Sequence, residues 1–135
     1  MNIAVCLDDR NGLLFNCRRQ SQDAVVRERL LQLAGEHGLW MNRYSAGQFE
    51  STDNITVDEA FPENVPAGMW CFVENTDICL WKDRIEKIAI YRWNRQYPSD
   101  VVFPVEEFEV NWCPVSIREF SGTSHERITE EIYQL

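Results

Sequence analysis

Residues 85–104, IEKIAIYRWNRQYPSDVVFP, constrain the fold of this chain more than any other stretch. The stretch begins with a run of β-branched and aromatic residues, which favours a strand. It then passes through Pro98-Ser99-Asp100, a sequence typical of a turn, into a second short apolar run. We therefore expect a strand here around which the rest of the chain is built.

The amino-terminal half of the chain contains one clear helical pattern. Apolar residues recur at helical spacing within residues 26–33, so they fall on one face of a helix. Ser21 is a suitable N-cap, and Asp23 lies where a carboxylate favours the helix dipole. Gly35 or Gly38 is expected to end this helix, the longest in the chain.

Short apolar or alternating runs predict the remaining elements. Asn11-Gly12 is a strong turn signal after the first run, and Pro114 within the last run suggests an edge strand or a bulge. The prolines between residues 51 and 68 make that segment mostly loop. We expect strands at residues 2–7, 13–15, 39–41, 55–57, 69–73, 87–91 and 110–120, and short helical segments at residues 44–50 and 76–81.

The carboxyl-terminal segment, residues 127–135, allows two interpretations. The spacing of Ile128 and Ile132 fits a helix, which propensity favours, whereas the pair Ile132-Tyr133 fits a final strand. In either case, strands interleaved with one main helix and a few short helices predict an α/β fold. We expect a single domain, residues 1–135, with a central mixed β-sheet.

The composition opposes several classes of function. A formal net charge of -9 opposes contact with a phosphate backbone, so we expect no nucleic-acid partner. No apolar run approaches the length of a membrane span, and the amino terminus lacks the pattern of a signal peptide. We therefore expect a cytoplasmic protein without a membrane partner. The sequence does not indicate its oligomeric state.

Cysteine and histidine usage favours neither a disulfide framework nor a metal site. The five cysteines are an odd number and include no CxxC motif, so reduced thiols are the expectation. A thiolate nucleophile needs a nearby base, and the only histidines are His37 and His125. We interpret His37 as a cation at a helix end and His125 as a turn residue, and we expect no metal.

Several segments follow the order of the segments of a known family. The start, IAVCLDDRNGLLFN, and the run LAGEHGLWMNR are similar to its first strand with an Asn-Gly loop and to the end of its first helix with the next strand. Phe49-Glu50-Ser51 resembles its Thr-Phe-Glu-Ser segment. Cys71-Phe72-Val73 falls where the family has Phe-Val-Ile-Gly-Gly. Residues 86–104 align without a gap on its Lys-Leu-Tyr-Leu-Thr strand and the following turn. On these segments the chain resembles dihydrofolate reductase, which implies that fold and a final hairpin strand.

The chain departs from that family at the cofactor site. The family's Gly-Gly pair allows backbone amides to approach a pyrophosphate, and Glu74-Asn75 stands in its place here. A carboxylate about 4 Å from a phosphate charge costs roughly 4 kcal/mol at an effective dielectric of 20. The loop at residues 51–68 is also too short for the family's adenosine-binding subdomain. We therefore expect no dinucleotide and no other cofactor.

The substrate side of the resemblance is altered too. Asp23 corresponds to the family's acidic proton-relay residue only after a shift of one helical turn, and a helix N-terminal charge is the alternative interpretation. Tyr91 replaces the pocket threonine, and its ring would occupy the substrate's space. Arg92 and Arg95 could hold an anion with Trp93 stacking, or Arg92 could pair with a carboxylate. The candidate ligand-binding residues are Trp40, Glu74, Asn75, Tyr91 and Arg92.

Three functions follow from these residues, in order of preference. The first is a non-catalytic binding or regulatory protein whose partner is an unknown small molecule or protein. The second is a small reductase or other enzyme in a residual cleft between residues 69–73 and 87–91, with Asp23 as the acid. The third is a zinc-dependent ribonuclease, because the chain also resembles short proteins that carry the label ribonuclease Z. That enzyme needs a His-x-His-x-Asp-His motif, which two isolated histidines cannot supply.

Overall fold

Seven strands form one mixed sheet in the computed structural model, which describes residues 1–108 and 112–135. The first five strands in sheet order are parallel, and the last two are antiparallel to their neighbours. The order is β5 (Ile55–Val57), β4 (Leu39–Met41), β6 (Trp70–Phe72), β1 (Asn2–Leu7), β7 (Lys87–Arg92), β10 (Ile128–Gln134) and β9 (Cys113–Phe120).

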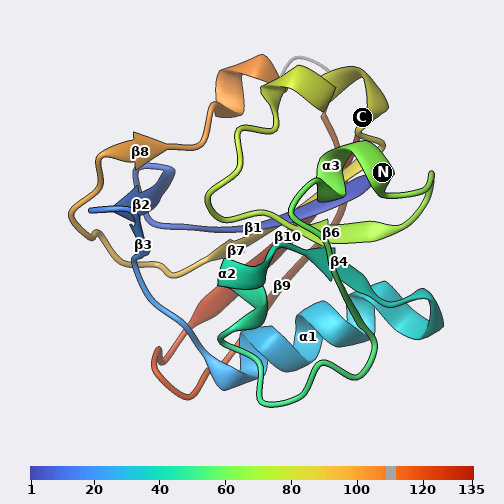
Figure 1. Ribbon diagram of the computed structural model, residues 1–135. Helices are drawn as coiled ribbons and strands as arrows, with labels where there is room; N and C mark the ends of the chain where they lie inside the picture. The colour runs from blue at the N-terminus through green and yellow to red at the C-terminus, as the bar shows by residue number, and fades with distance from the viewer. Residues whose placement is uncertain (109–111) are drawn as a thin grey trace.

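A second, three-stranded sheet lies beyond the end of the main sheet at which β1 ends (Figure 1). It consists of β3 (Arg18–Arg19), β2 (Gly12–Phe15) and β8 (Val101–Val102), with β2 in the middle. Asn16 and Cys17 join β2 to β3, and both have positive φ, 50° and 61°. This matches a two-residue hairpin turn, whose central residues require that backbone region.

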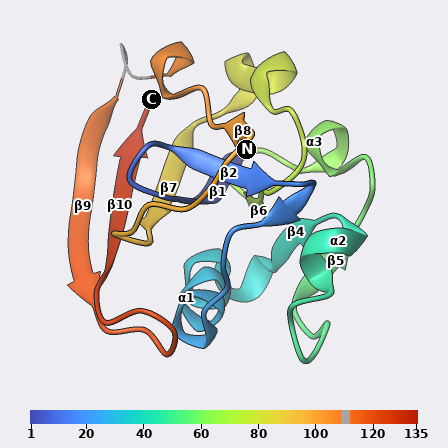
Figure 2. The ribbon, with the colours of Figure 1, turned by 90° about the vertical axis from the view of Figure 1, so that its left-hand side faces the viewer.

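The main helix, α1 (Ala24–Ala34), covers one face of the large sheet, as Figure 2 shows. Its N-cap is Asp23, whose side chain accepts a hydrogen bond from the Val25 N–H, so the expected Ser21 cap is wrong. Gly35 ends the helix at φ 63°, as its position predicts. The shorter helices are η1 (Gly35–His37), α2 (Arg43–Ala46), α3 (Phe61–Asn64), η2 (Cys79–Arg84) and η3 (Val105–Glu107).

The apolar core lies on both faces of the sheet because the buried strands alternate between them. In β1, Ile3 and Val5 belong to the cluster that includes the small sheet, whereas Ala4 belongs to the cluster under α1. All three side chains are fully buried. The central strands therefore show continuous apolar runs, which is the pattern that residues 85–104 displayed in the sequence.

Most predicted strands are confirmed, including the edge position of the strand that contains Pro114. The carboxyl-terminal segment is the strand β10, so the helix that propensity favoured is wrong. β10 pairs with β7 and β9, and these two ladders outweigh a weak local preference. The helical segment expected at residues 44–50 is α2 at Arg43–Ala46, and Asn42 is its N-cap. The helical segment expected at residues 76–81 lies at Cys79–Arg84, and the predicted residues 110 and 111 lie outside the described residues.

Candidate functional site

The parallel strands β4, β6, β1 and β7 end at one edge of the large sheet. β1 connects through α1 to β4 on one side, and β6 connects to β7 on the other side of β1. Ligands of open α/β sheets bind at such a change of direction, outside the carboxyl ends of the strands. The prediction of a cleft between residues 69–73 and 87–91 is wrong, because β1 lies between the two strands, β6 and β7, and pairs with both.

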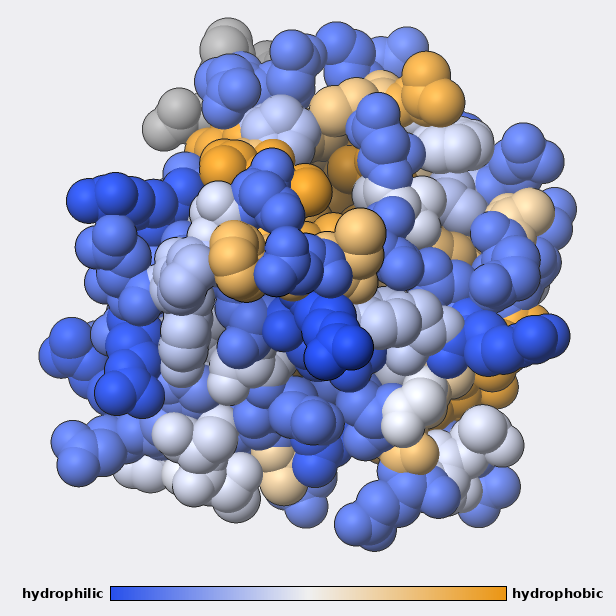
Figure 3. All heavy atoms as spheres, turned by 60° about the vertical axis from the view of Figure 1, so that its left-hand side comes forward, coloured by the Kyte–Doolittle hydropathy of each residue, from blue (hydrophilic) through white to orange (hydrophobic). Residues whose placement is uncertain are grey.

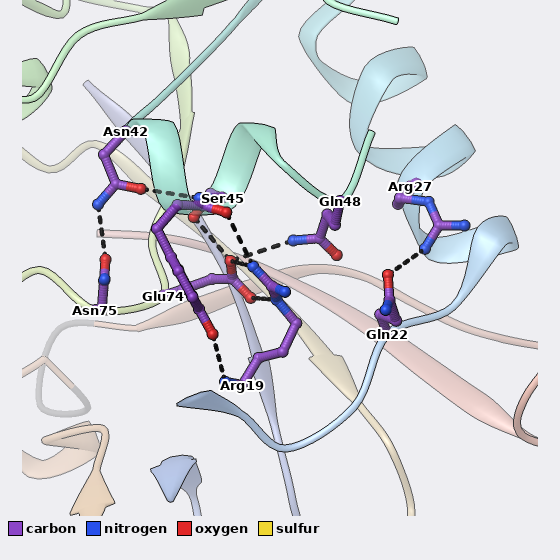
Figure 4. A network of polar contacts seen from close by, with 9 residues as sticks. Arg19, Gln22, Arg27, Asn42, Ser45, Gln48, Glu74 and Asn75 are labelled. Carbon is purple, nitrogen blue, oxygen red and sulfur yellow. Dashed lines mark hydrogen bonds and ion pairs between the residues drawn. The ribbon is translucent and has the colours of Figure 1, made fainter. Parts of the chain in front are cut away.

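The centre of this edge is a largely buried ion pair between Arg19 and Glu74 (Figure 4). Glu74 follows β6 and is only 6% exposed. Arg19 Nε donates to Glu74 Oε2 at 2.8 Å, and Arg19 Nη2 donates to Oε1 at 3.1 Å. Ser45 Oγ and Gln48 Nε2 also donate to Oε1, at 2.8 Å and 3.2 Å. The carboxylate therefore has a full set of donors within the protein.

Tyr44 fixes the position of Arg19. The guanidinium carbon lies 4.3 Å from the centroid of the Tyr44 ring, and Arg19 Nη2 also donates to the Tyr44 carbonyl at 3.1 Å. The Tyr44 hydroxyl accepts a hydrogen bond from the Arg19 backbone N–H at 2.8 Å. Burial alone would lower the pKa of Arg19, but the hydrogen bond and charge of Glu74 outweigh burial and raise it. This pair ties the strand β3 to the end of β6.

A dinucleotide is unfavourable at Glu74 for a different reason from the one that the sequence predicted. The sequence predicted an uncompensated carboxylate, but the two charges neutralise each other here. A phosphate would instead have to displace the Arg19 side chain or leave the ion pair buried beneath it. Arg19 was missing from the predicted site residues. A glutamate directly after a buried strand requires a cationic partner, and that requirement was the signal that could have identified it.

A groove of about 460 Å³ remains beside this ion pair. One wall is apolar and comes from β2 and β8, where Val101 and Val102 are 43% and 55% exposed. The opposite wall is the polar segment that follows β6. Figure 3 shows hydrophobic atoms gathered in a hollow on this face, with hydrophilic atoms around it. The lining residues are Leu13, Leu14, Glu74, Asn75, Thr76, Asp77, Ile78, Cys79, Val101, Val102, Phe103 and Pro104.

Asp23 is held as a helix cap and not as a proton donor. Its Oδ1 accepts from the Val25 N–H at 2.8 Å, and its Oδ2 accepts from the Ser124 N–H at 2.7 Å and from Ser124 Oγ at 2.9 Å. Burial would raise the pKa of Asp23, but the hydrogen bonds from Ser124, Thr123 and Val25 outweigh burial and lower it to about 2. The carboxylate is therefore ionised at neutral pH, which contradicts its candidate role as an acid.

Three candidate ligand residues do not line the groove beside Glu74. Tyr91 is fully buried on the α1 face, where burial and the nearby Glu130 carboxylate raise the pKa of its hydroxyl. Trp40 packs against the apolar core on the other face. Arg92 points to that same side of the sheet, and its Nε lies 3.3 Å from Glu131 Oε2. The predicted ion-pair alternative for Arg92 is therefore confirmed.

Glu74 and Asn75 do line the groove, so the structure brings together two of the five candidate ligand residues. Asn75 Oδ1 accepts a hydrogen bond from Asn42 Nδ2 at 2.7 Å. Neither Cys6 on β1 nor Cys71 on β6 is suited to nucleophilic chemistry. Burial, with Glu74 nearby, raises the pKa of Cys6 well above its ordinary value, and burial raises the pKa of Cys71 to about 12.

No protein-family model matches the sequence, and no curated protein sequence matches it. Among residues 1–108 and 112–135, no three or more histidine, cysteine or acidic side chains are grouped so that they could hold a metal ion. Over the same residues, no helix has both the length and the apolar character needed to cross a membrane. The function has to be inferred from the edge of the sheet itself.

Proposed function

We propose that this chain is a protein of the dihydrofolate reductase type that has lost its nucleotide-binding elements and serves as a binding or regulatory protein. Its ligand would be a small, largely apolar molecule held in the groove beside Glu74. The observation that supports this proposal most directly is the buried Arg19–Glu74 pair, which fills the place where the resemblance puts the cofactor's phosphates. Asp23, the candidate acid, instead caps α1, and Tyr91, at the position of the family's pocket threonine, is part of the apolar core.

The order of elements supports the family resemblance. The segments that resemble the family's first strand, its Phe-Val-Ile strand and its Leu-Tyr-Leu-Thr strand are β1, β6 and β7, which are adjacent in the sheet. The final segment is the strand that the resemblance implied. A fold does not by itself specify an activity, so the ligand has to be argued from the groove.

The groove has the character of a small-molecule site. Its volume of about 460 Å³ falls in the usual range for ligand pockets, and such pockets combine apolar walls with a few polar groups. The apolar wall includes Val101 and Val102, which are unusually exposed for valines. Asp77 lies on the opposite wall and is exposed. A ligand with a flat apolar body and a hydrogen-bond donor or a positive charge at one end fits both walls.

Nile red, a neutral apolar dye, tests this groove. We expect its emission to rise saturably with the wild-type protein, because the dye can leave water for the wall formed by β2 and β8. Val102→Asp should abolish this rise by placing a charge on the apolar wall. Val115→Asp is the matched control, because Val115 is 57% exposed but lies on β9, away from the groove. Equal dye binding by both variants, or none by the wild type, would contradict the proposal.

A further inference from the structure

The polar wall of the groove beside Glu74 carries two carboxylates with different surroundings. Glu74 is 6% exposed, pairs with Arg19 and accepts further hydrogen bonds from two other side chains. Asp77 is exposed, and its Oδ1 accepts from the Cys79 N–H at 3.0 Å. Within residues 1–108 and 112–135, no basic side chain pairs with Asp77. Asp77 is therefore the lining carboxylate that can still accept a cationic group.

The thiol of Cys79 reports the electrostatic potential at this wall. Cys79 begins η2 and lines the groove together with Asp77. Burial is the largest cause that raises the pKa of this thiol, and the charge of Asp77 and its hydrogen bond raise the pKa further. Glu107 adds to the shift, while Lys82 opposes it with a smaller effect. The carboxylates thus outweigh the ammonium group at the sulfur atom, so the potential there is negative.

The lining of the groove, among the residues that the structure describes, includes no lysine, arginine or histidine. Two basic side chains lie close to lining residues, and both already have carboxylate partners. Arg19 is bound by Glu74, and Lys82 Nζ lies 3.1 Å from Glu107 Oε2. The net charge of -9 adds a field of the same sign over the whole molecule. The groove therefore attracts a cation and repels an anion.

The opposite wall requires more than a charge. Val101 and Val102 are 43% and 55% exposed on that wall, so water contacts apolar side chains when the groove is empty of an organic molecule. An inorganic cation would satisfy Asp77 and leave this wall wet. A neutral hydrocarbon would cover the wall and leave the carboxylate without a counter-charge. A molecule that combines an apolar body with an ammonium group satisfies both walls.

We propose that the groove selects protonated amines with an apolar body, and that Asp77 is the residue that determines this specificity. This inference rests on the proposed function, because it names the ligand class of the same groove. The ammonium group binds the Asp77 carboxylate through charge-assisted hydrogen bonds, and the apolar body packs against the valines of β8. Neutral molecules of the same shape bind more weakly because they lack the first contact, and apolar acids are repelled.

Two ligands with the same ring system isolate the effect of the charge. 1-Naphthylmethylamine is protonated at pH 7, whereas 1-naphthylmethanol is neutral. We expect isothermal titration calorimetry to show that the wild-type protein binds the amine about fivefold more tightly than the alcohol, which is the gain of an exposed ion pair. This ratio should fall as the salt concentration rises from about 20 mM to about 500 mM, because salt screens exposed charges.

Asp77→Asn should bind the amine and the alcohol with equal affinity. Its affinity for the alcohol should match that of the wild type, because asparagine keeps a side-chain oxygen that can accept from the Cys79 N–H. Asp83→Asn is the matched control. It removes the same charge from an exposed residue of η2 that does not line the groove, so it should keep the preference for the amine.

The outcomes separate this inference from the proposed function. Equal affinity of the wild type for the two ligands, or a preference that survives in Asp77→Asn, would overturn the assigned specificity while the groove remained a binding site. A preference lost equally in Asp83→Asn would assign it to the net charge and not to Asp77, and would also overturn the inference. Absence of binding by both naphthyl ligands and by Nile red would contradict the proposed function and this inference together.

Discussion

Arg19 and Glu74 show how the surroundings of an ion pair determine what it contributes to stability. Their side chains are 19% and 6% exposed, whereas those of the pair Lys82–Glu107 are 49% and 46% exposed. Removing one partner of a buried pair leaves a charge without compensation in a medium that solvates it poorly. An exposed pair loses little, because water replaces the partner.

Glu74→Gln should therefore lower the free energy of unfolding by about 3 kcal/mol, since the Arg19 guanidinium, only 19% exposed, would lose its carboxylate partner. Chemical denaturation at neutral pH measures this loss. Glu107→Gln is the matched control, and it should leave the free energy of unfolding close to that of the wild type, since both partners of this pair are exposed. If the two variants were equally stable, the ion pair at the sheet edge would not be the anchor that we describe.

The lowered pKa of Asp23 predicts that part of the free energy of unfolding depends on pH in the acidic range. Its pKa of about 2 in the folded protein lies below its ordinary value of 3.8. The ionised carboxylate therefore stabilises the folded protein fully at pH values above 3.8. This contribution, about 2 kcal/mol, is lost as the pH falls from about 5 to 2. Asp23→Asn should be less stable than the wild type at pH 7, and the difference should shrink through that window. Denaturation midpoints measured at several pH values check this, and a constant difference would contradict it.

At the scale of elements, two connections hold the carboxyl edge together. β3 brings Arg19 to the end of β6, and the turn between β9 and β10 brings Ser124 to the start of α1. Gly122 lies where that turn touches the helix cap. A Cβ atom added there would lie 2.3 Å from Asp23 Oδ2 and 2.6 Å from Ile128 Cδ1. The turn can therefore approach α1 only because this residue lacks a side chain.

Gly122→Ala should destabilise the protein by about 1 to 3 kcal/mol, because either Asp23 or the turn has to move. Thermal unfolding measures the effect. Gly47→Ala is the control, since its Cβ would lie no nearer than 3.4 Å to another atom outside its chain neighbours and its φ is -62°. The control should change stability little. A Gly122→Ala variant as stable as the control would show that the turn and the helix cap are not in close contact.

The sequence predicted the helices and strands better than the contacts between residues that are distant in the sequence. Residues 85–104 indicated a central strand because strand propensity and turn residues act locally, and β7 confirms it. Pro114 indicated an edge strand for the same reason. The contacts of Arg19 with Glu74 and of Ser124 with Asp23 span 55 and 101 residues, so no local pattern indicates them. Asp23 was assigned correctly only as a helix-terminal charge, since its capping geometry is local and its proton chemistry is not.

At the scale of the whole molecule, the two faces of the sheet have different roles. α1 and Tyr91 fill one face with apolar packing, while the small sheet β3-β2-β8 lies across the carboxyl edge and divides it. The groove is lined by residues of β2 and β8, whereas a second hollow of about 440 Å³ is lined by the end of β2 and by β3. Two separate hollows therefore lie near the edge at which open α/β sheets bind ligands.

The central claim is that the Arg19–Glu74 pair closes this edge to a dinucleotide, and an NADPH titration tests it most directly. The five tryptophans report binding through their fluorescence, and N-acetyl-tryptophanamide corrects for absorption by the nucleotide. We predict no saturable quenching up to about 1 mM NADPH, the upper end of common KM values. Saturable quenching by NADPH in this range would contradict the account.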